Sequence, residues 1–266
     1  MPEGDAVWRT ARRLDRALGG RTLVRSDFRV PAFATVDLAG ETVHEVVSRG
    51  KHLFAHVGED VSIHTHLKME GAWLVYDLGA RWTRPAHEAR IVLETEQIQA
   101  VGFALGVVEV LSRADEEAVV ARLGPDLLDP DFDAAEALRR LTADPGRRLA
   151  DALLDQANLA GIGNVYRNEI MFVHGLHPDS QVADDPDPAR TIRTARRMLL
   201  VNRDFAEIVT TGVRRRGERT WVYGRGGEPC RRCGTRVERR APVVTQSRDV
   251  DERVTYWCPR CQPAHG

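Results

Sequence analysis

Lysine is almost missing from this chain of 266 residues. Only Lys51 and Lys68 are lysines among its 38 basic residues, and all the others are arginines. Genome composition can produce such a bias on its own, but an ammonium and a guanidinium group do different chemistry. The two positions that keep a lysine are therefore candidates for a role that arginine cannot fill.

Long hydrophobic runs are missing as well. No stretch approaches the roughly 20 consecutive apolar residues that a membrane-spanning helix needs. The first residues are acidic and no apolar core follows them, which excludes an ordinary secretory signal peptide. We therefore expect a cytoplasmic protein that makes no contact with a membrane.

Cysteine is absent from the first 229 residues, and four cysteines lie in the last 37. This clustering excludes a disulfide framework spread through a secreted domain. The spacing is Cys230-x2-Cys233-x24-Cys258-x2-Cys261, and two such pairs can surround one Zn²⁺ ion tetrahedrally. Four cysteine ligands leave no open position, so one structural zinc is predicted. The long gap predicts a β-hairpin with an enlarged middle, residues 237–252, and the arginines around it predict phosphate binding.

The net charge of −1 hides two halves of opposite sign. Residues 1–185 carry 20 basic and 30 acidic residues, a balance of −10. Residues 186–266 carry 18 basic and 9 acidic residues, a balance of +9, and the two halves sum to −1. A basic end on an acidic body indicates a polyanionic partner that is contacted mainly by that end. The alternative is a basic surface that is merely solvated.

The hydrophobic pattern divides the chain into parts of different fold. Apolar residues at helical spacing predict a helix over Asp5–Leu18, with Asp5 as its N-cap and Gly19-Gly20 as its end. Short runs from residue 21 to about residue 112 predict a β-sandwich or barrel. A linker rich in proline and aspartate then leads into helical segments over residues 133–141, 147–160, 164–176 and 188–213. The predicted fold class is α+β with several domains, bounded at residues 1–115, 123–220 and 221–266.

A glycine turn stands between two of the predicted helices, in the stretch "LLDQANLAGIGNVYRNEI". The first helix is predicted to end near Leu159, and Asn164 is predicted to cap the next one. Gly161 and Gly163 leave backbone N–H groups accessible, and a helix N-terminus adds a favourable dipole for an anion. The motif predicts a phosphate site, with a plain helix–turn–helix corner as the alternative.

Four motifs occur in one order: "MPEG", "SRGKHLF", "LLDQANLAGIGNVYRNE" and "VYGRGGEPCRRCG…YWCPRC". Together they resemble the formamidopyrimidine-DNA glycosylase and endonuclease VIII family of base-excision repair, over residues 2–262. The resemblance implies an N-terminal β-sandwich with a flanking helix, a helix–two-turn–helix domain and a C-terminal four-cysteine zinc-finger hairpin, with DNA held between them.

The resemblance also implies which residues are catalytic. Removal of Met1 would leave the secondary amine of Pro2 at the chain terminus, and an α-amino group with a reference pKa near ~8 is partly neutral at pH 7. Its attack on C1′ of a deoxyribose gives a cationic iminium, which acidifies neighbouring C–H bonds and permits β- and δ-elimination. Glu3 would transfer protons and stabilise charge at C1′. Gly4 is expected to be a flexible link, and Lys51, in a predicted hairpin turn, to contact phosphate and assist proton transfer.

Further residues are assigned to DNA by the same resemblance. Met69 would fill the void that the damaged base leaves, a role that suits a flexible thioether. Asn164 and Asn168 would bind phosphate after the glycine turn. Arg253 would grip the phosphates of the flipped nucleotide.

The chain departs from the family pattern at several positions. Ala6 stands where many members carry a glutamate that takes part in the active site. Glu70 is a poor stacking residue beside Met69. The segment Thr211–Val222 is shorter than the base-covering loop of members that excise oxidised purines, which favours the endonuclease VIII branch. His64 and His66 form an H-x-H pair in a predicted strand without a third ligand, so we interpret them as ordinary strand residues.

The implied function is a bifunctional DNA glycosylase that removes oxidised bases, pyrimidines above all, and cleaves the abasic site through a Pro2 Schiff base. The alternatives are a purine-lesion formamidopyrimidine glycosylase and a damaged-DNA-binding protein with impaired catalysis. The expected partner is damaged double-stranded DNA, with single-stranded or bubble DNA as alternative forms. We expect a monomer associated with the nucleoid. Binding to undamaged duplex should weaken steeply with salt.

Overall fold

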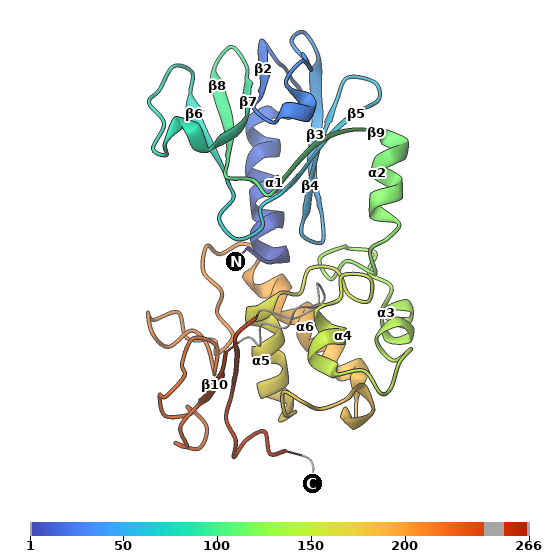
Figure 1. The fold of residues 1–266 in the computed structure, drawn as a ribbon, viewed down its shortest axis with the longest axis vertical. Helices are drawn as coiled ribbons and strands as arrows, with labels where there is room; N and C mark the ends of the chain where they lie inside the picture. The colour runs from blue at the N-terminus through green and yellow to red at the C-terminus, as the bar shows by residue number, and fades with distance from the viewer. Residues whose placement is uncertain (1, 242–252, 265–266) are drawn as a thin grey trace. The chain divides into compact units, whose positions relative to one another are not determined.

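A computed structural model describes residues 2–241 and 253–264 of the chain, so most of the enlarged middle of the predicted zinc-finger hairpin lies outside the described residues. The chain forms two compact units, Met1–Arg122 and Leu123–Gly266 (Figure 1). Within the described part, no helix combines the length and the apolar character that crossing a bilayer requires.

The first unit is a sandwich of two antiparallel sheets. Its strands are β1 (Arg21–Thr22), β2 (Arg25–Phe28), β3 (Thr42–Arg49), β4 (His52–Val57), β5 (Val61–His66), β6 (Ala72–Asp77), β7 (Ala89–Glu94), β8 (Ile98–Phe103) and β9 (Val107–Ser112). One sheet has the order β1-β3-β4-β5-β9 and the other β2-β7-β8-β6. Short 3₁₀ helices cover Pro31–Phe33 and Ala86–Glu88. The predicted β-sandwich is confirmed.

Helix α1 (Gly4–Leu18) flanks this sandwich, and its buried side includes Val7, Ala11, Leu14 and Leu18, at the helical spacing seen in the sequence. The predicted N-cap is wrong. Glu3, not Asp5, takes the extended N-cap conformation, with φ −112° and ψ −177°. Gly4 is already helical, so no flexible link separates Pro2 from the helix.

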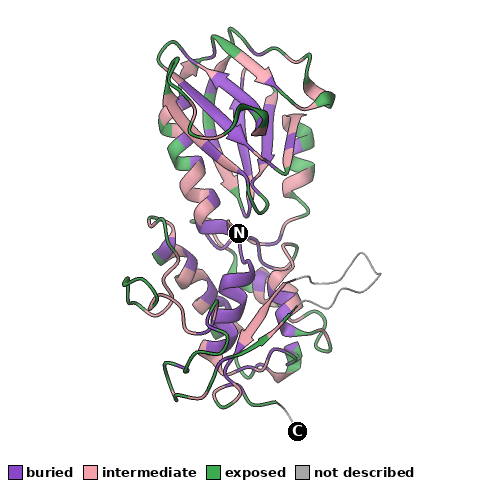
Figure 2. Cartoon of the chain, turned by 60° about the vertical axis from the view of Figure 1, so that its left-hand side comes forward, coloured by how far each residue is buried: buried purple, intermediate pink, exposed green. Residues whose placement is uncertain are grey.

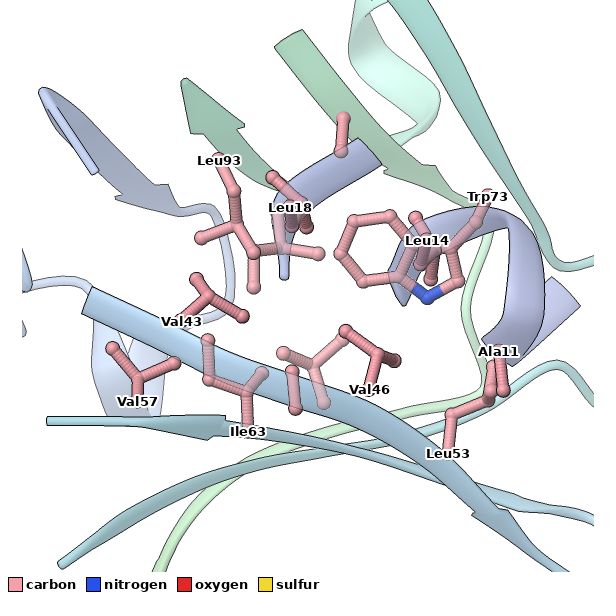
Figure 3. Close-up of a cluster of buried hydrophobic side chains, with 14 of the residues drawn as sticks. Ala11, Leu14, Leu18, Val43, Val46, Leu53, Val57, Ile63, Trp73 and Leu93 are labelled. Atoms are coloured by element: carbon pink, nitrogen blue, oxygen red, sulfur yellow. The ribbon is translucent and has the colours of Figure 1, made fainter. Parts of the chain in front are cut away.

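The core of the first unit lies where α1 meets both sheets. Figure 3 shows Leu14 and Leu18 of the helix with Val46 of one sheet and Leu93 of the other. Trp73 lies in this cluster and satisfies its indole N–H on Thr65 Oγ1, 3.2 Å away. Burial of these apolar side chains is the main stabilising contribution to the unit.

A helix that sequence reasoning left unassigned, α2 (Arg113–Val120), closes the first unit. Ser112 is its N-cap and accepts a hydrogen bond from the backbone N–H of Asp115 at 3.1 Å. The capping signal was present in "LSRADEEAVV", but the helix is only 8 residues long and its apolar face is weak.

The second unit combines four helices with a small hairpin. Its helices are α3 (Ala134–Leu141), α4 (Leu149–Leu154), α5 (Asn164–His174) and α6 (Pro188–Asn202), with a 3₁₀ helix over Val182–Asp184. Its strands are β10 (Glu238–Arg240) and β11 (Thr255–Trp257), which pair antiparallel. The helical domain and the predicted zinc-finger hairpin are both confirmed. Figure 2 shows α5 buried along most of its length.

Three predicted helix ends in this unit are wrong. Helix α4 stops at Leu154, because Asp155 turns the chain and accepts the N–H of Ala157 at 2.9 Å. Helix α6 stops at Asn202, whose carboxamide bonds both backbone groups of Val209. Gly163 is the N-cap of α5, so Asn164 is its first helical residue rather than its cap.

Candidate active site and DNA interface

The N-terminal end of α1 and the β3–β4 turn lie at one end of the first unit (Figure 1). Asp15 accepts the backbone N–H of Val46 at 2.9 Å, and Gly20 N–H donates to Val43 O at 2.7 Å, so α1 runs antiparallel to β3. From Asp15 back to residue 3 the helix spans about 18 Å. From Val46 forward to residue 51 the strand covers about 17 Å. Glu3 and Lys51 therefore stand at the same level of the sandwich.

Lys51 lies in a two-residue turn between β3 and β4. Arg49 pairs with His52 across this turn, and Gly50 has φ 58°, a conformation that favours glycine. The Lys51 side chain is buried, with 7% exposure. A lysine held by a tight turn in a protected place is suited to a fixed contact with an anion.

Met69 stands in the loop between β5 and β6, which the sheet register brings to the same end as Lys51. His52 pairs with His66, the last residue of β5, so the Lys51 turn and the Met69 loop are neighbours. The Met69 side chain is 67% exposed, and the loop is fixed by a hydrogen bond from Gly71 N–H to Leu67 O at 2.9 Å. Met69 is therefore an exposed thioether on a fixed loop, and its void-filling role stays a prediction.

The loop also stores backbone strain beside Met69. Lys68 has φ 52°, which is uncommon for any residue except glycine, asparagine or aspartate. A β-carbon at Gly71 would lie 2.3 Å from Leu67 O, so only glycine fits there. Lys68 and Glu70 are both exposed at the loop tip, so charged groups flank the apolar side chain.

Pro2 and Glu3 enter the helix without a break. Glu3 is fully buried and Pro2 half-buried. The carboxylate of Glu3 is therefore held in a protected place beside Pro2. Ala6, two residues into α1, is partly exposed and carries no carboxylate, whereas its neighbour Asp5 is a fully buried carboxylate.

His64 of the H-x-H pair takes part in a chain of hydrogen bonds that runs from His52 on β4 to Glu109 on β9. His64 Nδ1 lies 2.8 Å from Glu109 Oε2, and its Nε2 lies 2.8 Å from His52 Nδ1. Because the carboxylate can only accept, His64 donates to Glu109 and accepts from His52. Desolvation, with the neighbouring histidines and lysines, lowers the pKa of His52 to about 4 and that of His66 to about 3.

This histidine cluster predicts a loss of stability in mild acid. Both pKa values are lowered in the folded state from 6.5, so the unfolded chain takes up protons first as the pH falls below about 6.5. The free energy of unfolding should therefore be lower at pH 5 than at pH 7, by up to about 2 kcal/mol for each of the two histidines. Urea unfolding at the two pH values measures the loss. The difference should shrink in His52→Gln and in His66→Gln, and an unchanged difference would contradict the assignment.

The four cysteines come together in the second unit. Their sulfur atoms all lie within 4.8 Å of one another, and in the described part of the chain they are the only set of three or more cysteine, histidine or acidic groups that could share an ion. Cys233 Sγ lies 3.4 Å from Cys258 Sγ, and Cys230 Sγ lies 4.0 Å from Cys261 Sγ. Zinc–sulfur bonds of ~2.3 Å in a tetrahedron require sulfurs about 3.8 Å apart. The donor set and its spacing fit a structural Zn²⁺.

The two predicted phosphate-binding asparagines contact the zinc-finger hairpin. Asn164 Nδ2 donates to Val254 O at 2.9 Å, and Tyr256 N–H donates to Asn168 Oδ1 at 2.7 Å. Asn168 in turn donates to Asn164 O at 2.6 Å. Both side chains are buried, with exposures of 7% and 3%. Their contacts hold β11 against α5 and so fix the backbone next to the half-buried Arg253.

Sequence reasoning missed two buried charges of α5, Arg167 and Glu169. Arg167 is 1% exposed and donates to Asn164 Oδ1 at 2.6 Å and to Thr255 Oγ1 at 3.0 Å, which adds to the contact with the hairpin. Glu169 is fully buried and accepts three backbone N–H groups from residues 221–223. Both residues stand in "NVYRNEI", where charges among apolar residues inside a helix were an available signal.

Comparisons with known proteins agree with this architecture. Residues 1–104 match the formamidopyrimidine-DNA glycosylase N-terminal domain, and residues 123–222 match the formamidopyrimidine-DNA glycosylase H2TH domain. The chain is 53% identical to DNA-(apurinic or apyrimidinic site) lyase Nei2 of Mycolicibacterium smegmatis, over 99% of this chain and all of that protein. It is 54% identical to Endonuclease 8 2 of Mycobacterium tuberculosis, over 98% of this chain and all of that protein.

A solved structure supports the fold. The Lactococcus lactis Fpg in complex with DNA containing an abasic site matches with a TM-score of 0.81 at 22% identity, over 98% of this chain and 100% of that one. At this identity the likeness concerns the fold alone. With the full-length relatives above 50% identity, it leads to one assignment: the chain belongs to the formamidopyrimidine-DNA glycosylase and endonuclease VIII family, on its endonuclease VIII branch.

Proposed function

We propose that this protein is a bifunctional DNA glycosylase and abasic-site lyase of base-excision repair. The observation that carries the proposal is the end of the first unit, where Pro2 precedes the buried Glu3 at the start of a rigid helix and Lys51 stands at the same level. A terminal amine fixed on a helix retains the benefit of positioning, which a frayed chain end would lose.

The chemistry follows from the amine. The neutral nitrogen of Pro2 attacks C1′, the C1′–base bond breaks, and the base leaves with a proton supplied through the site. Glu3 stabilises positive charge at C1′ and protonates the sugar oxygen as the ring opens. The resulting iminium cannot lose its charge, because the proline nitrogen carries no second hydrogen. It withdraws electrons while C2′ loses a proton, and the 3′-phosphate leaves by β-elimination.

The DNA contacts are proposed residue by residue. Met69 fills the space of the extruded nucleotide, and Lys51 and Arg253 bind phosphates. Asn164 and Asn168 hold the hairpin beside Arg253. The N–H of Gly161, predicted to be accessible to a phosphate, is instead buried and donates to Gln156 Oε1 at 3.0 Å. One structural zinc, held by Cys230, Cys233, Cys258 and Cys261, stabilises the hairpin.

The proposed substrates are oxidised pyrimidines in double-stranded DNA. The support is the segment between Thr211 and Val222, which is too short to enclose a purine lesion in the way the resemblance implies for purine-specific members. A panel of duplexes with thymine glycol, dihydrouracil, hydantoins and 8-oxoguanine tests this choice. Faster excision of 8-oxoguanine than of thymine glycol would favour the purine alternative.

The lyase is tested by reductive trapping. The protein is incubated with duplex DNA containing an abasic site in the presence of borohydride, whose hydride converts the iminium into a stable amine. The expected result is a covalent protein–DNA adduct. No adduct would reject the lyase and favour a binding protein with impaired catalysis, for which Ala6 is the only support in the sequence.

Replacing Glu3 by glutamine is expected to separate the two activities. Excision of an oxidised base should fall by about 10²–10⁴-fold, since the carboxylate no longer transfers protons or stabilises charge while the C1′–base bond breaks. Cleavage of a preformed abasic site should fall much less, because its aldehyde needs no base departure. Single-turnover rates on the two substrates measure the split, and an equal loss on both would contradict the role given to Glu3.

A further inference from the structure

The loop Thr210–Trp221, which we call the arginine loop, is a strongly basic segment outside the site described above. Its tip, residues 212–217, reads "GVRRRG", and every residue of the tip is exposed. Gly212 and Gly217 bound the tip, each with φ 82°. Arginine at three consecutive exposed positions is unlike the rest of the described surface, where arginines stand singly or in pairs.

A buried carboxylate fixes both ends of this loop. At one end of the loop, Glu169 accepts a hydrogen bond from the Thr210 hydroxyl. At the other end, it accepts a hydrogen bond from Trp221 N–H at 2.7 Å. The next two N–H groups, of Val222 and Tyr223, also donate to it, at 2.9 and 2.8 Å. Burial raises the pKa of Glu169, and these four donors oppose that shift. Taking a carboxylate out of water is costly, so its partners must be held firmly to compensate.

Further bonds stiffen the stem of the loop. Thr210 N–H donates to Arg219 O at 2.8 Å, and the Thr211 hydroxyl donates to Glu218 O at 2.7 Å. From the zinc knuckle, Arg231 donates to Thr220 O at 3.0 Å and also to Gly217 O. The tip is therefore tied to the zinc module as well as to α5.

The charges at the tip remain accessible. The Arg215 side chain is 80% exposed, and its contact with Glu218 at 3.3 Å is a surface ion pair that contributes little. Arg214 stacks on the ring of Phe205, 3.6 Å from its centroid, which orients the guanidinium without neutralising it. Arg216 is exposed. Three guanidinium groups on consecutive residues of a tethered loop can bind the phosphates of a nucleic-acid strand.

We infer that the arginine loop is a second phosphate-binding surface, which grips the DNA backbone and contacts no base. The inference rests on the proposed function, since it takes duplex DNA as the partner. Arginines that served only solubility would not need a loop whose ends are held by the buried Glu169. The segment that is too short to enclose a purine lesion thus supplies affinity for the backbone, and loss of its charges weakens binding equally on damaged and undamaged duplexes.

The test compares two double variants that remove the same charge. Arg215→Ala with Arg216→Ala removes two loop arginines, and Arg193→Ala with Arg197→Ala removes two exposed arginines of α6. Dissociation constants for an undamaged duplex are measured from 50 to 200 mM salt. Each lost phosphate contact lowers the slope of log affinity against log salt by about 0.9, so the loop variant should lose about 1.8. Over this range its affinity then falls roughly 12-fold less than that of the wild type.

The inference is overturned if the loop variant keeps the wild-type slope, or if the α6 variant loses as much. The trapping experiment on the wild type decides the proposed function separately. A wild type that traps abasic DNA, with an unchanged slope in the loop variant, retains the lyase and rejects the loop as a phosphate site.

A second experiment tests whether Glu169 holds the arginine loop in place. Glu169→Gln, and as a milder change Thr210→Val, should speed tryptic cleavage within residues 214–216 and weaken binding several-fold while the zinc content stays at one ion. If Thr210→Val, folded by that criterion, leaves both cleavage and affinity at the wild-type level, the loop is not held in the way we infer.

Discussion

Replacement of Pro2 by glycine is expected to reduce strand cleavage at an abasic site by about a thousandfold, or roughly 4 kcal/mol of transition-state stabilisation. The borohydride-trapped adduct should fall to background in the same incubation. Glycine still offers an α-amine, so the loss comes from two other properties. A primary amine gives an imine that can lose its proton and with it most of its electron demand. Glycine also removes the ring that fixes the chain leading into α1.

Two measurements separate this explanation from misfolding. The glycine variant should bind abasic-site duplex within a few-fold of the wild type, and mass spectrometry should show that Met1 is removed from both proteins. If the variant traps DNA at the wild-type level, neither the ring nor the secondary amine of Pro2 is required, and the position of the adduct in the chain decides between the α-amine and a side chain. The scarcity of lysine then restricts the side-chain candidates to Lys51 and Lys68, and Lys51→Arg and Lys68→Arg keep the charge while removing the amine.

Much of the fold follows from local patterns in the sequence. The spacing of short strand-like runs predicted a sandwich or barrel, and helical spacing predicted the buried side of α1, because each signal depends on neighbouring residues alone. The choice of a sandwich came from the family resemblance. Helix ends were less predictable. The end of α6 is set by the carboxamide of Asn202 bonding Val209, and the start of α1 by Glu3 taking the extended conformation that Asp5 was expected to take. Such choices depend on which side chain the tertiary structure buries.

The candidate site also contains residues that local sequence could predict and residues that it could not. The four cysteines were predictable, since their spacing carries the chemistry, and the structure brings their sulfurs together. The surroundings of Asn164 and Asn168 were not predictable, because their partners lie in β11 and just before it, close to 90 residues away along the chain. Local sequence could not distinguish an asparagine that contacts phosphate from one that also holds the hairpin. The anchoring of the arginine loop by Glu169 joins segments about 50 residues apart and was equally hidden.

Removal of zinc is expected to abolish DNA binding while leaving the sandwich folded. Structural zinc sites of this type supply about 10–16 kcal/mol of folding free energy at pH 7. The module around Cys258 has only a small apolar cluster, formed with Phe172 of α5, Val222 and Val237, and cannot replace that contribution. Without the ion, β11 should leave α5, and Arg253 and the arginine loop should lose their positions together. Affinity for undamaged duplex should fall by at least about 100-fold.

The measurement uses the whole protein. Metal analysis should find one zinc per chain, a strong chelator should remove it, and re-added zinc should restore binding in the wild type. Cys258→Ser, which removes a buried ligand, should neither retain zinc nor recover binding when zinc is added. Backbone amides of β3, β4 and β5 should stay protected from hydrogen exchange, because the first unit has its own hydrophobic core. A wild type that holds no zinc and binds DNA equally well in chelator would show that the four cysteines serve another purpose.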